Sequence, residues 1–261
     1  MNTRHLDASE ILSKVPAATA GFWIVKILAT TLGEVGGNLV SMNMGLGYLT
    51  ATLILASVFV SLAVIQILAR RFHASLYWLT IVASTTAGTT LADYATRSIG
   101  LGYTGGSILL LSLVIASLIA WRFALGKVSA DQIADRRTEL FYWITITFSQ
   151  TLGTALGDWF ADTAGLGYWG SALVISAILL VVLGLQLRRM VDGVWLFWAA
   201  FVLTRPLGAV VGNFLDKPDH GGLALDRPLI VITLSVLMVV VMIILPQKAG
   251  HHKAAPAPEA E

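Results

Sequence analysis

The chain has 261 residues, of which 56% are hydrophobic and only 12% are charged, and its formal net charge is +2. Soluble domains carry roughly twice that share of charged residues, so the composition indicates a protein whose solvent is lipid. The small net charge gives no support for nucleic-acid binding. The absence of cysteine excludes disulfides, thiolate metal ligands and a cysteine nucleophile.

The chain divides into two membrane halves with polar segments around them. Residues 1–19 lack the apolar run of a signal peptide and are expected to form a cytoplasmic N-terminal segment. The first half is predicted at 20–125 and the second at 139–246, with a cytoplasmic linker at 126–138. Residues 247–261 are polar and rich in Ala and Pro, so we expect a disordered cytoplasmic tail.

Eight apolar segments are long enough to cross a bilayer, because a transmembrane helix needs about 20 residues. We expect spans at 20–43, 49–69, 74–96, 103–124, 139–161, 168–187, 194–215 and 228–246. The even-numbered segments are almost purely aliphatic, whereas the odd-numbered ones carry polar and charged residues. Such residues are costly in hydrocarbon, so the odd-numbered helices should face one another or water. The predicted fold is therefore an all-α integral membrane protein with eight transmembrane helices.

The distribution of basic residues predicts the orientation in the membrane. Twelve of the 17 Lys and Arg residues lie at the termini or in the even-to-odd connections. Cytoplasmic loops carry an excess of Lys and Arg, so both termini are expected in the cytoplasm.

Each pair of segments is one copy of a repeat. Shifts of 55, 65 and 55 residues superpose four copies from a tryptophan to a polar residue fifteen positions later. The aligned columns are Trp23, Trp78, Trp143 and Trp198; Thr30, Thr85, Gln150 and Arg205; Gly33, Gly88, Gly153 and Gly208; and Asn38, Asp93, Asp158 and Asn213. The first three copies end in Gly-Leu-Gly-Tyr, which we interpret as a tight outer turn. All copies enter the membrane in the same direction, so they are parallel repeats.

This pattern resembles a bacterial family of uncharacterised membrane-anchored proteins that is defined by four tandem copies of a repeat of unknown function. The Trp-x9-Gly-x4-(Asn/Asp) spacing and the trailing Gly-Leu-Gly-Tyr carry the resemblance, which covers about residues 20–246. The resemblance implies two transmembrane helices per repeat and a bacterial inner membrane. It implies no activity.

Residues four apart share one face of a helix, and this face is polar in every odd-numbered span. Glu34, Asp93 and Asp158 lie on three equivalent helices, and only Lys26 and Arg205 oppose them at similar depth, which leaves a formal excess of one negative charge. Gly residues and Pro206 beside Arg205 suggest a discontinuous helix at a substrate site.

The leading hypothesis is a transporter for a small cation, moving between the odd-numbered helices. The hard oxygen ligands suit Mn²⁺, Mg²⁺ or a monovalent, proton-coupled cation. Glu34, Asp93 and Asp158 would bind the ion, and Lys26 and Arg205 would act as counter-charges. The proposed shell is completed by Asn38, Asn213, Thr30, Thr85, Thr89, Gln150 and Thr154.

Three other interpretations stay open. Arg205 and Lys26 could hold a small organic solute, or the polar stripe could join helices in a membrane scaffold or sensor. The polar residues could also be structural: tryptophans as interfacial anchors, Arg97 reaching water at a span end, and Lys26–Glu34 and Arg205–Asp158 as ion pairs. No catalytic motif is present, so we expect neither an enzyme nor a cofactor, and the partners expected are lipid and a small solute. Whether the chain forms a homo-oligomer is left open.

Overall fold

The computed structural model describes residues 10–128, 133 and 135–253. Within these ranges the eight expected helices are present, and their ends lie close to the predicted ones. They are α1 (Ala20–Asn38), α2 (Gly47–Leu68), α3 (Ala74–Asp93), α4 (Gly102–Leu125), α5 (Arg136–Asp158), α6 (Gly167–Leu187), α7 (Gly193–Asp216) and α8 (Arg227–Ile244). The helical part of the prediction is therefore confirmed.

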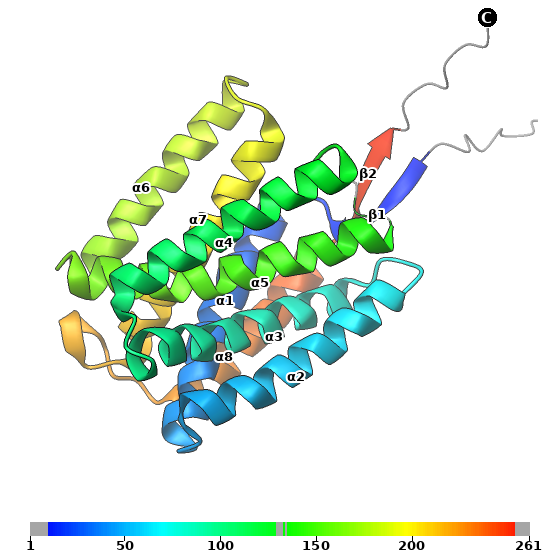
Figure 1. Cartoon of the computed structure of the whole chain (residues 1–261). Helices are drawn as coiled ribbons and strands as arrows, with labels where there is room; N and C mark the ends of the chain where they lie inside the picture. The colour runs from blue at the N-terminus through cyan, green and yellow to red at the C-terminus, as the bar shows by residue number, and fades with distance from the viewer. Residues whose placement is uncertain (1–9, 129–132, 134, 254–261) are drawn as a thin grey trace, which may run out of the picture.

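The odd-numbered helices form a closed ring, in which α1 packs on α3, α3 on α5, α5 on α7 and α7 on α1. Each even-numbered helix lies outside the ring against the odd-numbered helix of the next repeat. Thus α2 packs on α3, α4 on α5 and α6 on α7, and α8 closes the circle by packing on α1 (Figure 1). A ring of four equivalent helices has one axis, and the polar face of every repeat can meet there.

The glycine column allows the ring helices to come this close. A Cβ added at Gly33 would lie 2.5 Å from Cβ of Thr85, and one at Gly208 would lie 2.6 Å from Cβ of Thr30. Gly88 and Gly153 meet Gln150 and Arg205 in the same way. Each glycine therefore packs against the residue seven positions after the tryptophan in the next helix of the ring, and this contact runs all the way round.

The first three ring helices end in the same local structure. A five-residue π-helical turn follows directly after Asn38, Asp93 and Asp158, at η1 (Leu39–Asn43), η2 (Tyr94–Ser98) and η3 (Trp159–Thr163). Both glycines of each Gly-Leu-Gly-Tyr then have φ between +62° and +84°, a conformation that glycine adopts without steric cost. The predicted tight turn is confirmed in these three repeats. The diverged fourth repeat has a short 3-10 turn instead, η4 (Asp219–Gly221).

Two short strands pair at the other end of the bundle, β1 (Glu10–Pro16) and β2 (Ala249–Lys253), which are antiparallel. The prediction of a disordered tail is wrong for 249–253, because these residues form backbone hydrogen bonds with the N-terminal segment; 1–9 and 254–261 lie outside the described residues. Figure 1 shows the pair beside the ends of α4 and α5. We call this end of the bundle the strand end and the opposite end, where the glycine turns lie, the turn end.

Five of the described helices are long and apolar enough to cross a membrane: α2, α4, α6, α7 and α8. The helices α1, α3 and α5 fall short of this criterion because they carry more polar residues. Large apolar side chains of the outer helices are exposed, among them Leu173 at 66% and Ile243 at 74%. Apolar faces of this extent on every outer helix are typical of a membrane protein.

Candidate functional site

An aromatic layer closes the ring axis at the strand end. The residue before each repeat tryptophan is also aromatic, and its ring contacts the tryptophan of the next ring helix at 5.4–6.0 Å between centroids. The pairs are Phe22–Trp78, Tyr77–Trp143, Tyr142–Trp198 and Phe197–Trp23. The hydroxyls of Tyr77 and Tyr142 share a hydrogen bond of 2.6 Å across the layer. The interpretation of the tryptophans as interfacial anchors is wrong for three of them, because Trp78, Trp143 and Trp198 are buried in the core.

Lys26 lies one turn further in, and its ammonium group has no hydrogen-bond partner. The side chain is fully buried, and Nζ lies 4.0 Å from the centroid of the Phe201 ring, on which it makes a cation–π contact. Gln150, on the opposite helix of the ring, is also fully buried, and neither its amide nitrogen nor its amide oxygen has a partner. Buried polar atoms usually have hydrogen-bond partners, so the side chains of Lys26 and Gln150 have donors and an acceptor that a ligand could use.

Arg205 and Glu34 form a buried ion pair at the centre of the ring. Nη1 of Arg205 lies 3.2 Å from Oε2 of Glu34, and both side chains are at most 1% exposed. Nη2 of Arg205 donates to the hydroxyls of Thr89 and Thr154, each at 2.7 Å. These hydroxyls in turn donate to Oε2 of Glu34 at 3.1 and 2.8 Å. Residues of all four ring helices thus meet in one network, while Nε of Arg205 has no partner.

The column of Asn and Asp residues forms a second network toward the turn end. Asn38 donates to the amide oxygen of Asn213 at 3.2 Å, and Asn213 donates to Asp158 at 2.9 Å. Arg97 bridges the remaining gap, because its guanidinium lies 2.9 Å from Asp93 and 3.1 Å from Asp158. Arg97 is exposed, as expected for a residue that reaches water at a span end, and it is also the counter-charge of two predicted site acids.

Three further charged residues, Asp216, Lys217 and Arg227, belong to the site but are not among the predicted site residues. Asp216 is buried, accepts a hydrogen bond from Asn38 at 3.0 Å and pairs with Arg227 at 2.6 Å. Lys217 is 7% exposed and interacts electrostatically with Asp158. Asp216 lies three residues after Asn213, on the same face of the helix, and this spacing could have revealed it.

With these residues counted, the buried charges at the axis and its turn end are four acids, Glu34, Asp93, Asp158 and Asp216, and three bases, Lys26, Arg205 and Lys217. The predicted excess of one negative charge is therefore kept among the buried residues of the described part of the chain. Arg97 and Arg227 are partly exposed and pair with three of these acids from the turn end. Every one of these acids has a basic partner within 3.2 Å, whereas Lys26 pairs with none.

Several predicted roles do not match the geometry. The hydroxyls of Thr30 and Thr85 bond to carbonyls of their own helix and of a neighbouring helix, so they join helices and do not face the axis. Arg205 pairs with Glu34 and not with Asp158, and Lys26 does not pair with Glu34. The helix α7 runs on through Pro206 without a break, so the predicted discontinuous helix is absent.

The predicted metal ligands are also arranged otherwise than expected. Among the described residues there is no group of three His, Asp or Glu side chains that could hold a metal ion. Glu34 points to Arg205, and Asp93 and Asp158 point to Arg97. Each of these three carboxylates therefore has a guanidinium group as its partner.

The fold and this site define a class of protein: a helical bundle of membrane type, in which four repeats build a charged network on one axis. Four consecutive segments, residues 21–72, 76–126, 141–191 and 196–246, match the Repeat of Unknown Function (DUF347). The chain belongs to this family. No curated protein and no solved structure matches it.

Proposed function

We propose that the protein is a multi-pass transporter of the bacterial inner membrane, with both termini in the cytoplasm. The exposed apolar faces of the outer helices suit a bilayer, and the ring keeps the charged residues away from lipid. The basic residues gather at the strand end, which corresponds to the cytoplasmic side. The solute would pass along the ring axis, between the aromatic layer and the network at the turn end.

The solute that fits best is a small organic anion bearing a carboxylate. The observation that carries this choice is Lys26, a fully buried amine without a hydrogen-bond partner, beside acids that are each already paired with another base. Bringing an unpaired charge into a low-dielectric interior costs several kcal/mol, so an anion that pairs with it would bind favourably. Gln150 and Nε of Arg205 would supply further hydrogen bonds to the carboxylate.

The Glu34–Arg205 pair would then act as an internal switch. Glu34 compensates Arg205 in this state, and a solute carboxylate on Lys26 would compete with Glu34 for Arg205. Thr89 and Thr154 donate to Glu34 and accept from Arg205, so they hold both partners in place when the site is empty. For solute to enter from the cytoplasm the aromatic layer must open, which requires the Tyr77–Tyr142 hydrogen bond to break.

Uptake into proteoliposomes tests this proposal. We would measure entry of radiolabelled acetate, pyruvate and benzoate with the full chain and with Lys26→Met. Wild type should show saturable uptake of at least one anion, and Lys26→Met should reduce it at least tenfold. The variant should melt no lower than wild type, because a buried unpaired charge is removed. The matched control Lys248→Met, at an exposed position, should transport normally.

A second candidate function is cation transport. Two unpaired oxygen atoms at the turn end favour it. Oδ1 of Asn38 and Oδ1 of Asp216 are buried without a donor, and both belong to the ligand type that binds hard cations. Uptake of ⁸⁶Rb⁺ or ⁵⁴Mn²⁺ in the same vesicles, without anion uptake, would favour this candidate over the first. A folded protein that moves none of these probes would be a scaffold or sensor.

A further inference from the structure

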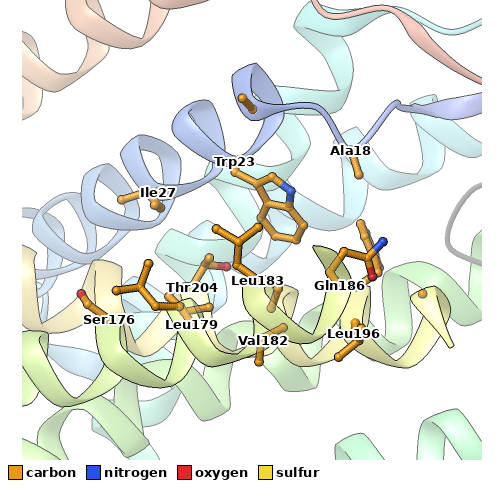
Figure 2. Close-up of a pocket in the computed structure, with 15 residues that line it drawn as sticks. Ala18, Trp23, Ile27, Ser176, Leu179, Val182, Leu183, Gln186, Leu196 and Thr204 are labelled. Carbon is orange, nitrogen blue, oxygen red and sulfur yellow. The ribbon is translucent and has the colours of Figure 1, made fainter. Parts of the chain in front are cut away.

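An apolar groove runs along the outside of the ring between α1, α6 and α7. It has a volume of about 750 Å³, within the range of about 300–1,000 Å³ that is usual for ligand sites. Figure 2 shows Trp23 and Ile27 on one wall and Leu179, Val182 and Leu183 on the other. The groove extends from Gln186, at the strand end, to Ser176 and Thr204, about halfway along the bundle.

The groove lies where an outer helix leaves a ring tryptophan partly uncovered. The outer helix α2 places Phe59 on Trp143, at 6.2 Å between ring centroids, and α4 places Trp121 on Trp198, at 5.8 Å. The helix α6 lies in the corresponding place beside Trp23. It carries aliphatic residues and Gln186 there instead and stands away from α1, so Trp23 is only half-buried (Figure 1).

The strand end of the groove is basic. Arg188 and Arg189 follow α6 directly and are exposed, beyond Gln186 at the end of the groove. The one acid nearby in sequence, Asp192, caps α7 by accepting a hydrogen bond from the backbone N–H of Val194. An apolar groove with two exposed arginines directly after the helix that forms its wall is complementary to an apolar chain attached to an anionic headgroup.

We infer that this groove binds an anionic phospholipid, with one acyl chain between Trp23 and Leu183 and the phosphate on Arg188 and Arg189. The lipid covers Trp23 at the strand end of the ring, where α6 carries aliphatic residues and Gln186. The groove lies outside the ring axis, so this inference is independent of which solute the protein transports.

The repeat supplies a matched control for the test. Arg70 and Arg71 follow α2 as Arg188 and Arg189 follow α6, but Phe59 fills the corresponding space beside α2. We would purify the full chain from nanodiscs of equal parts phosphatidylglycerol and phosphatidylcholine and count retained lipids by native mass spectrometry. Wild type should retain one phosphatidylglycerol. The double variant Arg188→Ala/Arg189→Ala should weaken retention roughly tenfold or more, and Arg70→Ala/Arg71→Ala should leave it unchanged.

A second variant tests the groove itself. Ala200 lines it on α7, and Ala200→Phe should fill it and abolish retention, whereas Ala116→Phe on the exposed face of α4 should not. Equal loss with both arginine pairs would show that surface charge alone attracts the lipid and would overturn the inference. Retention unaffected by Ala200→Phe, equal retention of phosphatidylcholine, or a dimer that buries the groove would also overturn it.

Discussion

The substitution Gly208→Ala tests whether the ring helices are packed as closely as the glycine column indicates. A Cβ at this position would lie 2.2 Å from Oγ1, 2.6 Å from Cβ and 2.9 Å from the carbonyl carbon of Thr30. Rotating the Thr30 side chain cannot relieve the last two contacts, so α1 and α7 must move apart. Overpacking of this kind costs about 1–3 kcal/mol. We expect a loss of about 2 kcal/mol, which corresponds to a fall in melting temperature of roughly 4–8 °C.

Gly184→Ala is the matched control for this measurement. Gly184 also lies in a helix, but a Cβ there would meet nothing within 4 Å. Alanine is the better helix former by about 0.5–1 kcal/mol, so this variant should be slightly more stable than wild type. Thermal unfolding in detergent, followed by tryptophan fluorescence, measures both. A Gly208→Ala protein as stable as Gly184→Ala would refute the close packing of α1 on α7.

Three further predictions concern the charged and capping residues. Glu34→Gln should destabilise the protein by about 3–5 kcal/mol, because it leaves the buried charge of Arg205 without its carboxylate. The double variant Glu34→Gln/Arg205→Met should recover most of this stability, measured by denaturant unfolding. If the double variant recovers none of it, the pairing of the two residues is contradicted. Lys14→Met should break the 2.7 Å ion pair with Glu139 and raise the rate of amide hydrogen exchange in β1 roughly tenfold without unfolding the helices. An unchanged exchange rate would show that this ion pair does not hold β1 in place. Asp135→Ala should cost about 1 kcal/mol at neutral pH, because its carboxylate caps α5. Partial burial raises the pKa of Asp135, but hydrogen bonds from the first turn of α5 outweigh it and hold the pKa below its usual value. The cap therefore stabilises the fold above the unfolded pKa and is lost as the pH falls through the folded one, so the difference from wild type should vanish in acid; a constant difference would refute it.

The helices could be predicted from the sequence because apolar runs and the repeat fix them locally. The predicted span 103–124 became Gly102–Leu125, and the span 194–215 became Gly193–Asp216. The strand β2 was missed because its pairing with β1 joins residues more than 230 positions apart, and no local pattern reports such a contact.

The site could be predicted only in part. The fifteen-residue spacing identified Asp93 and Asp158, the polar helix face added Glu34, and the ring brings their networks to one axis. The sequence could not show which acid pairs with which base, because this depends on which helices are neighbours in the ring. Arg97, at the end of α3, for example, donates a hydrogen bond to Asp158 on the neighbouring helix α5. The position of Arg97 near the end of a span predicted that its side chain would reach water, but its guanidinium also contacts the carboxylates of Asp93 and Asp158.

The central claim is that the ring axis serves as the path of a solute, and cysteine accessibility tests it most directly. The chain has no cysteine, so single substitutions need no altered background. Ala209 is fully buried, at the same repeat position as Glu34, Thr89 and Thr154. In proteoliposomes Ala209→Cys should react with a membrane-impermeant, negatively charged methanethiosulfonate, and a transported carboxylate should slow the reaction. Leu173→Cys, on the exposed apolar face of α6, should not react, and an Ala209→Cys protein equally inert under all conditions would contradict a path along the axis.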